Sequence, residues 1–325
     1  MRNGRYAASV VAAGMMPCLA FSQGSTGPAD GYPARPVRVV VAQGAGGNAD
    51  VQARLFAAKL GESLGRQFIV DNRPGRHISW TLVAKAPADG YTLLVVLPDF
   101  IYAPALFSNL PVDPARDFAP ISLMSRTPYL LVINPAVAAK SVKELIALTN
   151  AAPGKLNFGG GIVGSGTHLM TVYLFTLAGI KASYVSYKGV AQAVVDTLAG
   201  QIDAGFTTGS AVTHIKSGKL RALGISTAQR SRLLPDIPTI AEQGVSGFDA
   251  AAFHGWAAPA GTAAAIVGRL SSEIIAIAKS PEAAGALGND NSEPVGTTPG
   301  EFRRFIANEI PRWRKLVRDS GITVD

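Results

Sequence analysis

The 325-residue sequence has one cysteine, Cys18, and few charged residues. Cys18 lies in an N-terminal segment that we expect to be removed, so the mature chain would have neither a disulfide nor a thiol for catalysis or metal binding. Charged residues make up 16% of the chain, against roughly 25% in ordinary soluble domains. Beyond the N-terminal segment no apolar run is long enough to cross a membrane, which predicts a soluble mature chain.

Patterns for metal binding and nucleophilic catalysis are also missing. The chain has four histidines, His77, His168, His214 and His254. None of them shows a metal-binding spacing such as two histidines four residues apart on a helix. Ser165 lies in a glycine-rich segment, but Val163 stands where a Gly-x-Ser-x-Gly motif needs glycine. We therefore expect no metal, no cofactor and no enzymatic activity.

The N-terminus has the layout of a secretory signal peptide. Arg2 and Arg5 precede an apolar stretch, and the small residues Cys18 and Ala20 stand three and one positions before a possible cleavage site. The apolar stretch is shorter than the ~20 residues of a spanning helix. We expect residues 1–20 to be removed on export to the periplasm, and the Gly-, Ser- and Pro-rich residues 21–34 to form a flexible linker.

The chain is basic, with 30 Lys and Arg residues against 22 Asp and Glu residues and a formal net charge of +8. A nucleic-acid-binding protein gathers such charge on one surface. Here the densest basic cluster, within residues 301–319, is interleaved with acidic residues in a helical pattern, which is typical of a solvated helix. We expect no nucleic-acid partner and a mild field that favours anionic ligands.

Short β-branched runs alternate with amphipathic helical patterns along the chain. This alternation predicts an α/β fold with parallel sheets that helices cover on both faces. The length and the 48% content of hydrophobic residues are sufficient for two cores. Open sheets of this kind bind ligands beyond the carboxyl ends of their strands. Strands are expected at 37–42, 68–71, 91–97, 129–133, 156–158, 184–186, 204–207 and 222–226.

Two glycine-rich segments follow expected strands and precede expected helices. In the first, Gln43–Asn48, glycine amides can approach a bound anion closely. In the second, residues 159–168, Thr167 is placed to cap the helix, while Ser165, His168 and free amides are placed to face a ligand.

The first segment also supports an alternative function. It fits a Gly-x-Gly-x-x-Ala dinucleotide fingerprint at Gly44, Gly46 and Ala49, and Asp71 ends the next strand where a ribose-binding acid is expected. A nicotinamide-dependent oxidoreductase that uses the Gly44–Ala49 loop is therefore the rival hypothesis. The signal peptide argues against it, because an exported chain meets little dinucleotide.

A series of short motifs resembles one family over nearly the whole mature chain. That family is the tripartite tricarboxylate transporter substrate-binding proteins, also called Bug proteins. Each motif alone is weak, but their number and order make the resemblance specific. The motifs lie at residues 32–41, 71–75, 88–94, 117–122, 153–157, 187–189, 218–223, 234–239 and 258–262.

The resemblance implies a two-lobed periplasmic-binding-protein fold of type II, with parallel-type sheets flanked by helices and two crossover strands. Lobe one would comprise residues 35–133 and 247–325, and lobe two residues 134–246. The lobes would close like a Venus flytrap on a small carboxylate, held largely by loop amides. The solute would then pass to the membrane subunits of a transporter, or be read by a sensor protein. We expect the protein to be a monomer.

Transferred by position, the resemblance suggests three ligand-binding segments, to which one departure from the family adds a fourth. After Gly75 the family usually continues with a glycine-rich stretch, whereas this chain has Arg76, Ser79 and Trp80. Either Arg76 contacts the ligand directly, or it lies on the surface while Trp80 packs in the core. The predicted ligand-binding residues are Gln43, Gly46, Gly47, Asn48, Asp50, Arg76, Ser79, Gly164, Ser165, Thr167, His168, Thr207 and Thr208.

Overall fold

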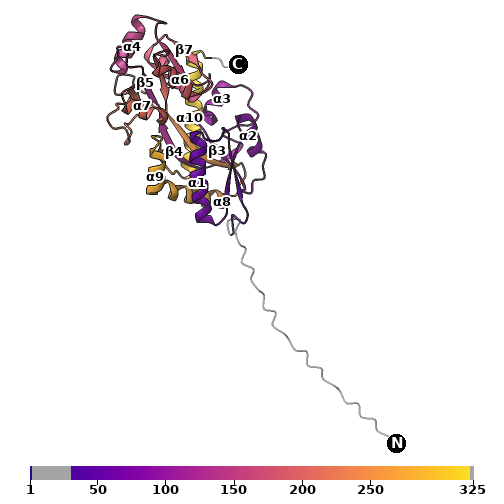
Figure 1. The fold of residues 1–325 in the computed structure, drawn as a ribbon. Helices are drawn as coiled ribbons and strands as arrows, with labels where there is room; N and C mark the ends of the chain where they lie inside the picture. Colours follow the sequence, from indigo (N-terminus) through magenta and orange to yellow (C-terminus); the bar gives the residue numbers. More distant parts are fainter. Residues whose placement is uncertain (2–30, 323–325) are drawn as a thin grey trace.

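The computed structural model of the chain describes residues 1 and 31–322, so most of the predicted signal peptide and linker lies outside the described residues. The chain forms two lobes, each a β-sheet flanked by helices, which lie one above the other in Figure 1. Lobe one is built on the sheet that contains β1 (Val37–Val41), and lobe two on the sheet that contains β6 (Asn157–Gly160).

Lobe one has a six-stranded sheet in the order β11-β4-β10-β3-β1-β2. β1 and β3 are parallel and almost wholly apolar, because their two faces pack into two different hydrophobic clusters. Its other strands are β2 (Phe68–Asn72), β3 (Thr92–Val96), β4 (Phe118–Pro128), β10 (Ala251–Pro259) and β11 (Glu293–Pro294). Its helices are α1 (Asn48–Leu64), α2 (Arg76–Ala84), α3 (Asp99–Leu106), α8 (Ala264–Ala278), α9 (Pro281–Gly288) and α10 (Pro299–Ser320).

Lobe two has a five-stranded sheet in the order β7-β6-β8-β5-β9. β6 is parallel to both of its neighbours, whereas β5 is antiparallel to both of its own. Its other strands are β5 (Leu130–Ile133), β7 (Ser183–Ser186), β8 (Ala204–Thr207) and β9 (Arg221–Ile225). Its helices are α4 (Val142–Ala151), α5 (Gly166–Ala178), α6 (Val190–Leu198), the 3₁₀ turn η1 (Gly209–Ala211) and α7 (Val212–Lys216).

Every strand expected from the sequence is present, with ends that differ by at most two residues. Two long strands, β4 and β10, were not expected, and they pair with each other in antiparallel register. Their sequences explain the omission: β4 contains two prolines and two serines, and β10 is rich in alanine rather than in β-branched residues. The sheets are therefore mixed, with parallel central strands and antiparallel crossing strands.

Two segments cross between the lobes, as the resemblance implied. The first runs from β4 through Tyr129 into β5, and the second runs from β9 through residues 226–250 into β10. They are joined where they cross: the Tyr129 amide donates to the Ser226 hydroxyl (2.9 Å), which donates to the Ala250 carbonyl (2.6 Å). The sheet changes just after Tyr129, so β5 lies in lobe two although the expected boundary placed it in lobe one. An extended chain can cross between sheets without any change in its apolar pattern.

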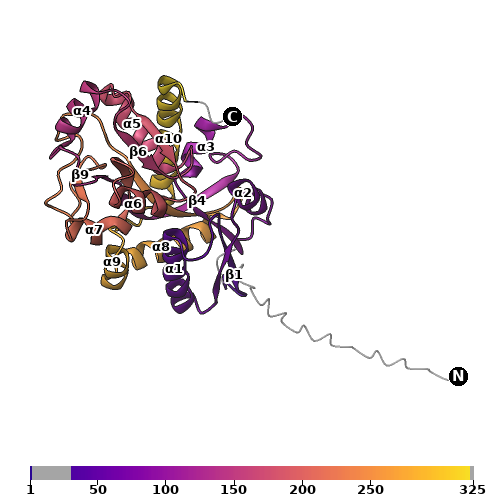
Figure 2. The ribbon, with the colours of Figure 1, turned by 45° about the horizontal axis from the view of Figure 1, so that its top comes forward.

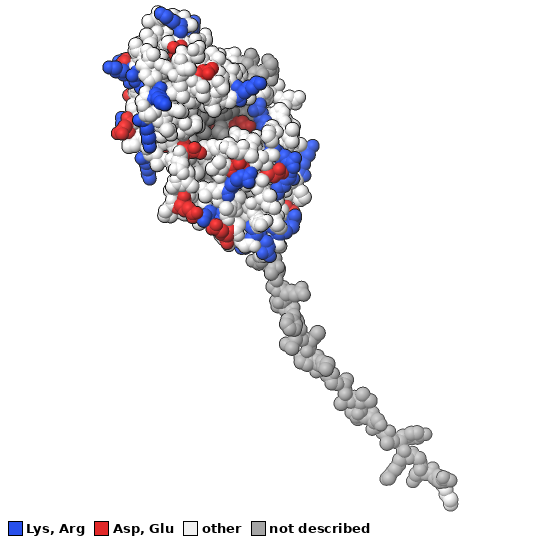
Figure 3. Space-filling model, in the orientation of Figure 1, with Lys and Arg blue, Asp and Glu red and all other residues white. Residues whose placement is uncertain are grey.

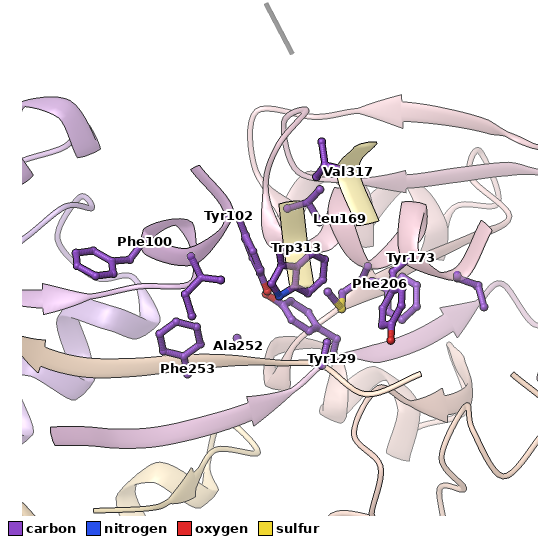
Figure 4. Packing of buried hydrophobic residues seen from close by; sticks show 14 of the residues in the cluster. Phe100, Tyr102, Tyr129, Leu169, Tyr173, Phe206, Ala252, Phe253, Trp313 and Val317 are labelled. Atoms are coloured by element: carbon purple, nitrogen blue, oxygen red, sulfur yellow. The ribbon is translucent and has the colours of Figure 1, made fainter. Parts of the chain in front are cut away.

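One hydrophobic cluster continues through both lobes. Figure 4 shows Phe100 and Phe253 of lobe one at one end and Tyr173 of lobe two at the other, with Trp313 between them. Trp313 belongs to α10, which lies beside α3 and α5 in Figure 2. Its ring packs edge-on against Tyr102 of α3 (centroids 4.5 Å apart) and Tyr173 of α5 (5.8 Å). Helix α10 therefore packs against both lobes.

Residues 31–34 of the expected linker lie among the described residues. Tyr32 is only 4% exposed, and its hydroxyl donates to the carbonyl of Gly90 (2.6 Å). Its ring also packs edge-on against Tyr91, with centroids 5.2 Å apart. Ordered packing therefore begins by Tyr32, because an aromatic side chain at this point covers the end of the lobe-one core.

Candidate ligand site between the lobes

The surface is hollowed between the two lobes, and acidic and basic side chains both lie around the hollow (Figure 3). The strand register shows which loops border it. β10 enters the lobe-one sheet with Gly255 opposite Val96, at the edge where β3 and β1 end. β5 enters the lobe-two sheet with Leu130 opposite Thr207, at the end of β8. The carboxyl ends of the parallel strands in each lobe therefore face the crossing point and the other lobe.

The β1–α1 loop presents amides rather than charged side chains. Gly46 has a φ of +83°, which favours glycine, and its amide donates to the Asp50 carboxylate (2.9 Å). Gly47 precedes the first helical residue without any side-chain cap. Within the described part of the chain, the amides of Asn48 and Ala49 have no acceptor. A bound anion could accept hydrogen bonds from these amides at the N-terminus of α1.

Asp50 is turned inward and organises this loop. Its side chain is 4% exposed and forms an ion pair with Arg54 (3.0 Å). Burial alone would raise the pKa of Asp50, but the Arg54 guanidinium and the Gly46 amide together hold it below its ordinary value. The carboxylate therefore stays ionised and already has partners. This geometry indicates a residue that positions the loop rather than one that contacts the ligand.

A buried hydrogen-bond network ties the same loop to both crossing strands. The Gln52 amide donates to the side chains of Asn48 (2.7 Å) and Ser292 (3.1 Å), and it accepts from Ser125 of β4. Ser125 also contacts His254 Nδ1 of β10 (3.3 Å). Sequence reasoning missed this network, because only the fold brings residues so distant in the chain together.

The β6–α5 loop is capped differently from the prediction. Ser165, not Thr167, is the N-cap, and its hydroxyl accepts from the His168 amide (3.4 Å). The Thr167 hydroxyl instead accepts from the Gly161 amide (2.9 Å), and Thr167 is 3% exposed. Ser165 can cap because its backbone is extended, with ψ at 164°, whereas Thr167 is already helical.

His168 supports this loop as a neutral ring. The Gly164 amide donates to His168 Nδ1 (3.0 Å), which leaves the proton on Nε2. The ring is 7% exposed and lies edge-on to Tyr184, and burial lowers its pKa. His168 therefore adds no positive charge to the site at neutral pH.

The N-terminus of α5 sits directly on the crossing point. A Cβ added to Gly166 would lie 2.1 Å from the Tyr129 hydroxyl, so only glycine fits there. The amides of Gly166 and Thr167 have no acceptor among the residues that the structure describes. Lobe two therefore offers an amide-lined helix N-terminus that matches the one offered by lobe one.

The β8–η1 segment forms a contact between the lobes. Thr207 is 1% exposed and its hydroxyl lies 3.5 Å from that of Ser210, whereas Thr208 is half-buried. A Cβ added to the next residue, Gly209, would lie 2.0 Å from the backbone oxygen of Asp290 in lobe one. This close backbone contact explains the glycine and leaves Thr208 as the more accessible of the two threonines.

The structure shows where the Arg76 and Trp80 side chains of α2 lie. Its guanidinium stacks over Phe107 with Cζ 4.3 Å from the ring centroid, and its buried Nε atom has no acceptor among residues 31–322. Ser79 is fully buried and its hydroxyl donates to the Arg73 carbonyl, so its hydrogen bond is made within the protein, near the α2 N-terminus. Trp80 is a core residue, edge-on to Phe100.

Asp99 is a further buried polar residue near the site that sequence reasoning missed. It begins α3 directly after β3, at the edge that faces lobe two. Its Oδ1 atom is buried and, within the described residues, has no hydrogen-bond partner. Burial raises its pKa to about 6, although the nearby Arg76 charge opposes that shift. The rule used for the glycine-rich loops, a polar residue just after an expected strand, would have found it.

The acid of the dinucleotide fingerprint is already paired. Arg38 Nε lies 2.8 Å from the Asp71 carboxylate, and Arg73 Nε lies 3.0 Å from it. Burial would raise the pKa of Asp71, but these two guanidinium groups hold it below its ordinary value. An acid held between two arginines is not free to bind a ribose hydroxyl.

Comparison with known proteins decides the family. The model of the tripartite tricarboxylate transporter family receptor matches residues 52–322. The chain belongs to this family. The dinucleotide-dependent alternative is not supported by any of the comparisons. Among the residues that the structure describes, this receptor has no group of three or more His, Cys, Asp or Glu residues placed to hold a metal, and no helix that could span a membrane.

Relatives of this receptor match it over nearly their full length. BugT of Bordetella pertussis is 38% identical over 298 residues, which cover 90% of this chain and 91% of BugT. The adipate-bound structure of Rpa4515 from R. palustris has a TM-score of 0.80 at 34% identity and covers 90% of this chain and 99% of its own. MatC of Rhodopseudomonas palustris with bound malate has a TM-score of 0.76 at 29% identity, with 88% and 100% covered.

Proposed function

We propose that this receptor is a periplasmic solute-binding protein that holds a small carboxylate between its lobes and does not transform it. The observation that carries the proposal is the pair of helix N-termini, α1 and α5, whose partner-free amides flank the crossing point from opposite lobes. Such amides stabilise a carboxylate. The adipate and malate bound by two structural relatives support the same ligand class.

The proposed contacts are the loop amides and a small number of side chains. Arg76 is included because its guanidinium is held by Phe107 and its buried Nε atom has no hydrogen-bond partner among the described residues. The buried Asp50, Ser79, Thr207 and His168 are assigned to positioning. The Gly46 and Gly164 amides already donate to Asp50 and His168, so these two glycines are also assigned to positioning. The proposed ligand contacts are Gln43, Gly47, Asn48, Arg76, Ser165, Gly166, Thr167 and Thr208.

A proline at position 48 tests the amide contact directly. Asn48 is the first residue of α1, where proline fits because no intrahelical acceptor is lost. Gly47 before it has φ −74° and ψ 164°, a conformation that a following proline accepts. Asn48→Pro removes the amide hydrogen and the side-chain bond to Gln52, whereas the matched variant Asn48→Ala removes only the side chain.

We expect calorimetry to show carboxylate affinity at least about tenfold weaker for Asn48→Pro than for Asn48→Ala, since a hydrogen bond to a charged group contributes roughly 1.5–3 kcal/mol. Equal affinities in the two variants would exclude the Asn48 amide as a ligand contact. A thermal-shift screen of aliphatic, aromatic and amino-acid carboxylates identifies the ligand to use. A shift with a dinucleotide and none with any carboxylate would contradict the proposed function.

The partner and the moving units follow from the same proposal. We assign residues 35–128 and 247–322 to one moving unit and 130–246 to the other, because the sheet changes at Tyr129. A monomer would deliver its solute to transporter membrane subunits or to a sensor protein. Small-angle scattering with and without ligand measures closure, and an unchanged radius of gyration at saturation would count against it.

A further inference from the structure

A second cavity, of about 690 Å³, lies beside the crossing segments. We call it the hinge cavity. It is bordered by the end of β4, by residues 227–233, by Asp249 and by residues 292–294 around β11. Its size falls within the roughly 300–1,000 Å³ of small-molecule sites. None of the proposed ligand contacts lines it, so it is distinct from the cleft described above.

The hinge cavity touches both crossing segments next to the bonds that join them. Pro128 precedes Tyr129, Thr227 follows Ser226, and Asp249 precedes Ala250. Tyr129, Ser226 and Ala250 are the three residues that hydrogen-bond to one another where the chain crosses. An occupant of the cavity would therefore contact the segments whose angle sets the relative position of the lobes.

The acidic groups of the hinge cavity are already used within the protein. Glu293 accepts from the Ser231 hydroxyl (3.1 Å) and from the Arg232 amide (3.2 Å). Asp249 accepts from the Ala228 amide (3.0 Å). The acids therefore mainly hold the 227–233 segment in place, and their capacity to attract a cation is reduced.

Two of the arginines that line the hinge cavity have no partner among the residues that the structure describes. Arg126 lies directly opposite Glu293 in the β4–β11 pair, yet it forms no ion pair with that carboxylate. Neither the Arg126 nor the Arg232 guanidinium has a hydrogen-bond or ion-pair partner among residues 31–322. Arg230, by contrast, is paired with Glu242 at 2.9 Å. The groups of the cavity that remain available are thus mainly hydrogen-bond donors. They are planar guanidinium groups, which suit carboxylates and phosphates.

We propose that the hinge cavity is a second anion site, which takes an oxyanion of the carboxylate or phosphate class through Arg126 and Arg232. An anion held there bridges β4 and the second crossing segment and so biases the angle between the lobes. The anion is either a free small ion or an acidic side chain of a partner protein. Binding at this site stands apart from the proposed function, and only its effect on closure rests on that function.

Calorimetry of the full mature chain tests the site with two probes, inorganic phosphate and an acetylated, amidated tetraglutamate peptide. The variants are Arg126→Gln, Arg232→Gln and, as a matched control, Arg303→Gln, which removes an exposed arginine of α10. We expect saturable binding of one anion per chain, at least tenfold weaker in the two cavity variants and within twofold of the parent in the control. Binding of phosphate assigns a free ion, and binding of the peptide alone assigns a partner side chain.

Three outcomes would overturn the proposal: no saturable binding of either probe, an equal loss in all three variants, or no loss in Arg232→Gln. Because Arg232 is exposed, a loss in that variant would not be explained by misfolding. The effect on closure is measured as the change in cleft-ligand affinity at a saturating concentration of the bound probe. We expect a change of at least threefold, with the reciprocal change in probe affinity. An unchanged cleft affinity would remove the coupling, whereas absence of any cleft ligand would contradict the proposed function and leave the probe titration intact.

Discussion

Asp99→Asn should make the unliganded protein more stable at neutral pH. Asp99 has a buried oxygen without a partner, and its pKa is raised from the ordinary 3.8 to about 6. A raised folded-state pKa means that the native state binds the proton more tightly than the unfolded chain. The contribution of Asp99 to stability is therefore present below about pH 4 and is lost as the pH rises through 6.

The difference of about two pKa units corresponds to about 3 kcal/mol at 1.36 kcal/mol per unit. Asparagine removes the charge but leaves a buried polar group, so the expected gain is roughly 1–3 kcal/mol at pH 7.5 and near zero at pH 3.5. Urea unfolding followed by tryptophan fluorescence at the two pH values measures it, since Trp80 packs on the neighbouring Phe100.

Asp50→Asn is the matched control with the opposite sign. Its carboxylate is paired with Arg54 and its pKa is lowered despite burial, so the variant should be less stable at pH 7.5. If Asp99→Asn is the less stable of the two at pH 7.5, or if its gain is the same at both pH values, the carboxylate is not the destabilising group that its burial indicates.

Arg76→Ala should weaken carboxylate binding at least about tenfold by calorimetry if its guanidinium contacts the ligand, and affinity within twofold of the parent with an intact fold would exclude that contact. Gly209→Ala should lower the melting temperature or expand the molecule in scattering, because a Cβ there would lie 2.0 Å from the Asp290 oxygen; a native-like variant would show that this lobe contact yields easily. Burial lowers the pKa of His254 to about 4, so its contribution of about 3 kcal/mol is present above pH 6.5 and lost as the pH falls towards 4; pH-dependent unfolding of His254→Gln should lack that loss.

The strands at the centre of each sheet could be predicted from the sequence because burial on both faces leaves an unbroken apolar run, as in Val37–Val41. The glycine-rich loops after β1 and β6 could be located because they follow such strands. The crossing strands could not be predicted in this way. Pro120 and Ser122 in β4, and the alanines and Gly255 in β10, weaken the β-strand pattern, and these strands are defined by pairing with each other.

At the site, residue type indicated which groups can form hydrogen bonds, but not whether they bond to a ligand or to the protein itself. Asp50 and Ser79 are polar residues near helix N-termini, where either a ligand or the protein itself could take their hydrogen bonds, and the fold directs both to the protein. Conversely, Asp99 and Gln52 gain their importance from contacts more than twenty residues away along the chain. Such partners are set by tertiary packing, which one sequence without relatives does not reveal.

The shared hydrophobic cluster joins the two lobes into one packed body. Trp313 packs on rings from both lobes, and Arg312 beside it donates to the Tyr173 hydroxyl (3.0 Å). Neither half would retain this packing if the chain were cut into two fragments, so each fragment would expose a broad aromatic surface and aggregate. The two halves should instead melt together in one cooperative calorimetric transition, as a single folding unit with two sheets.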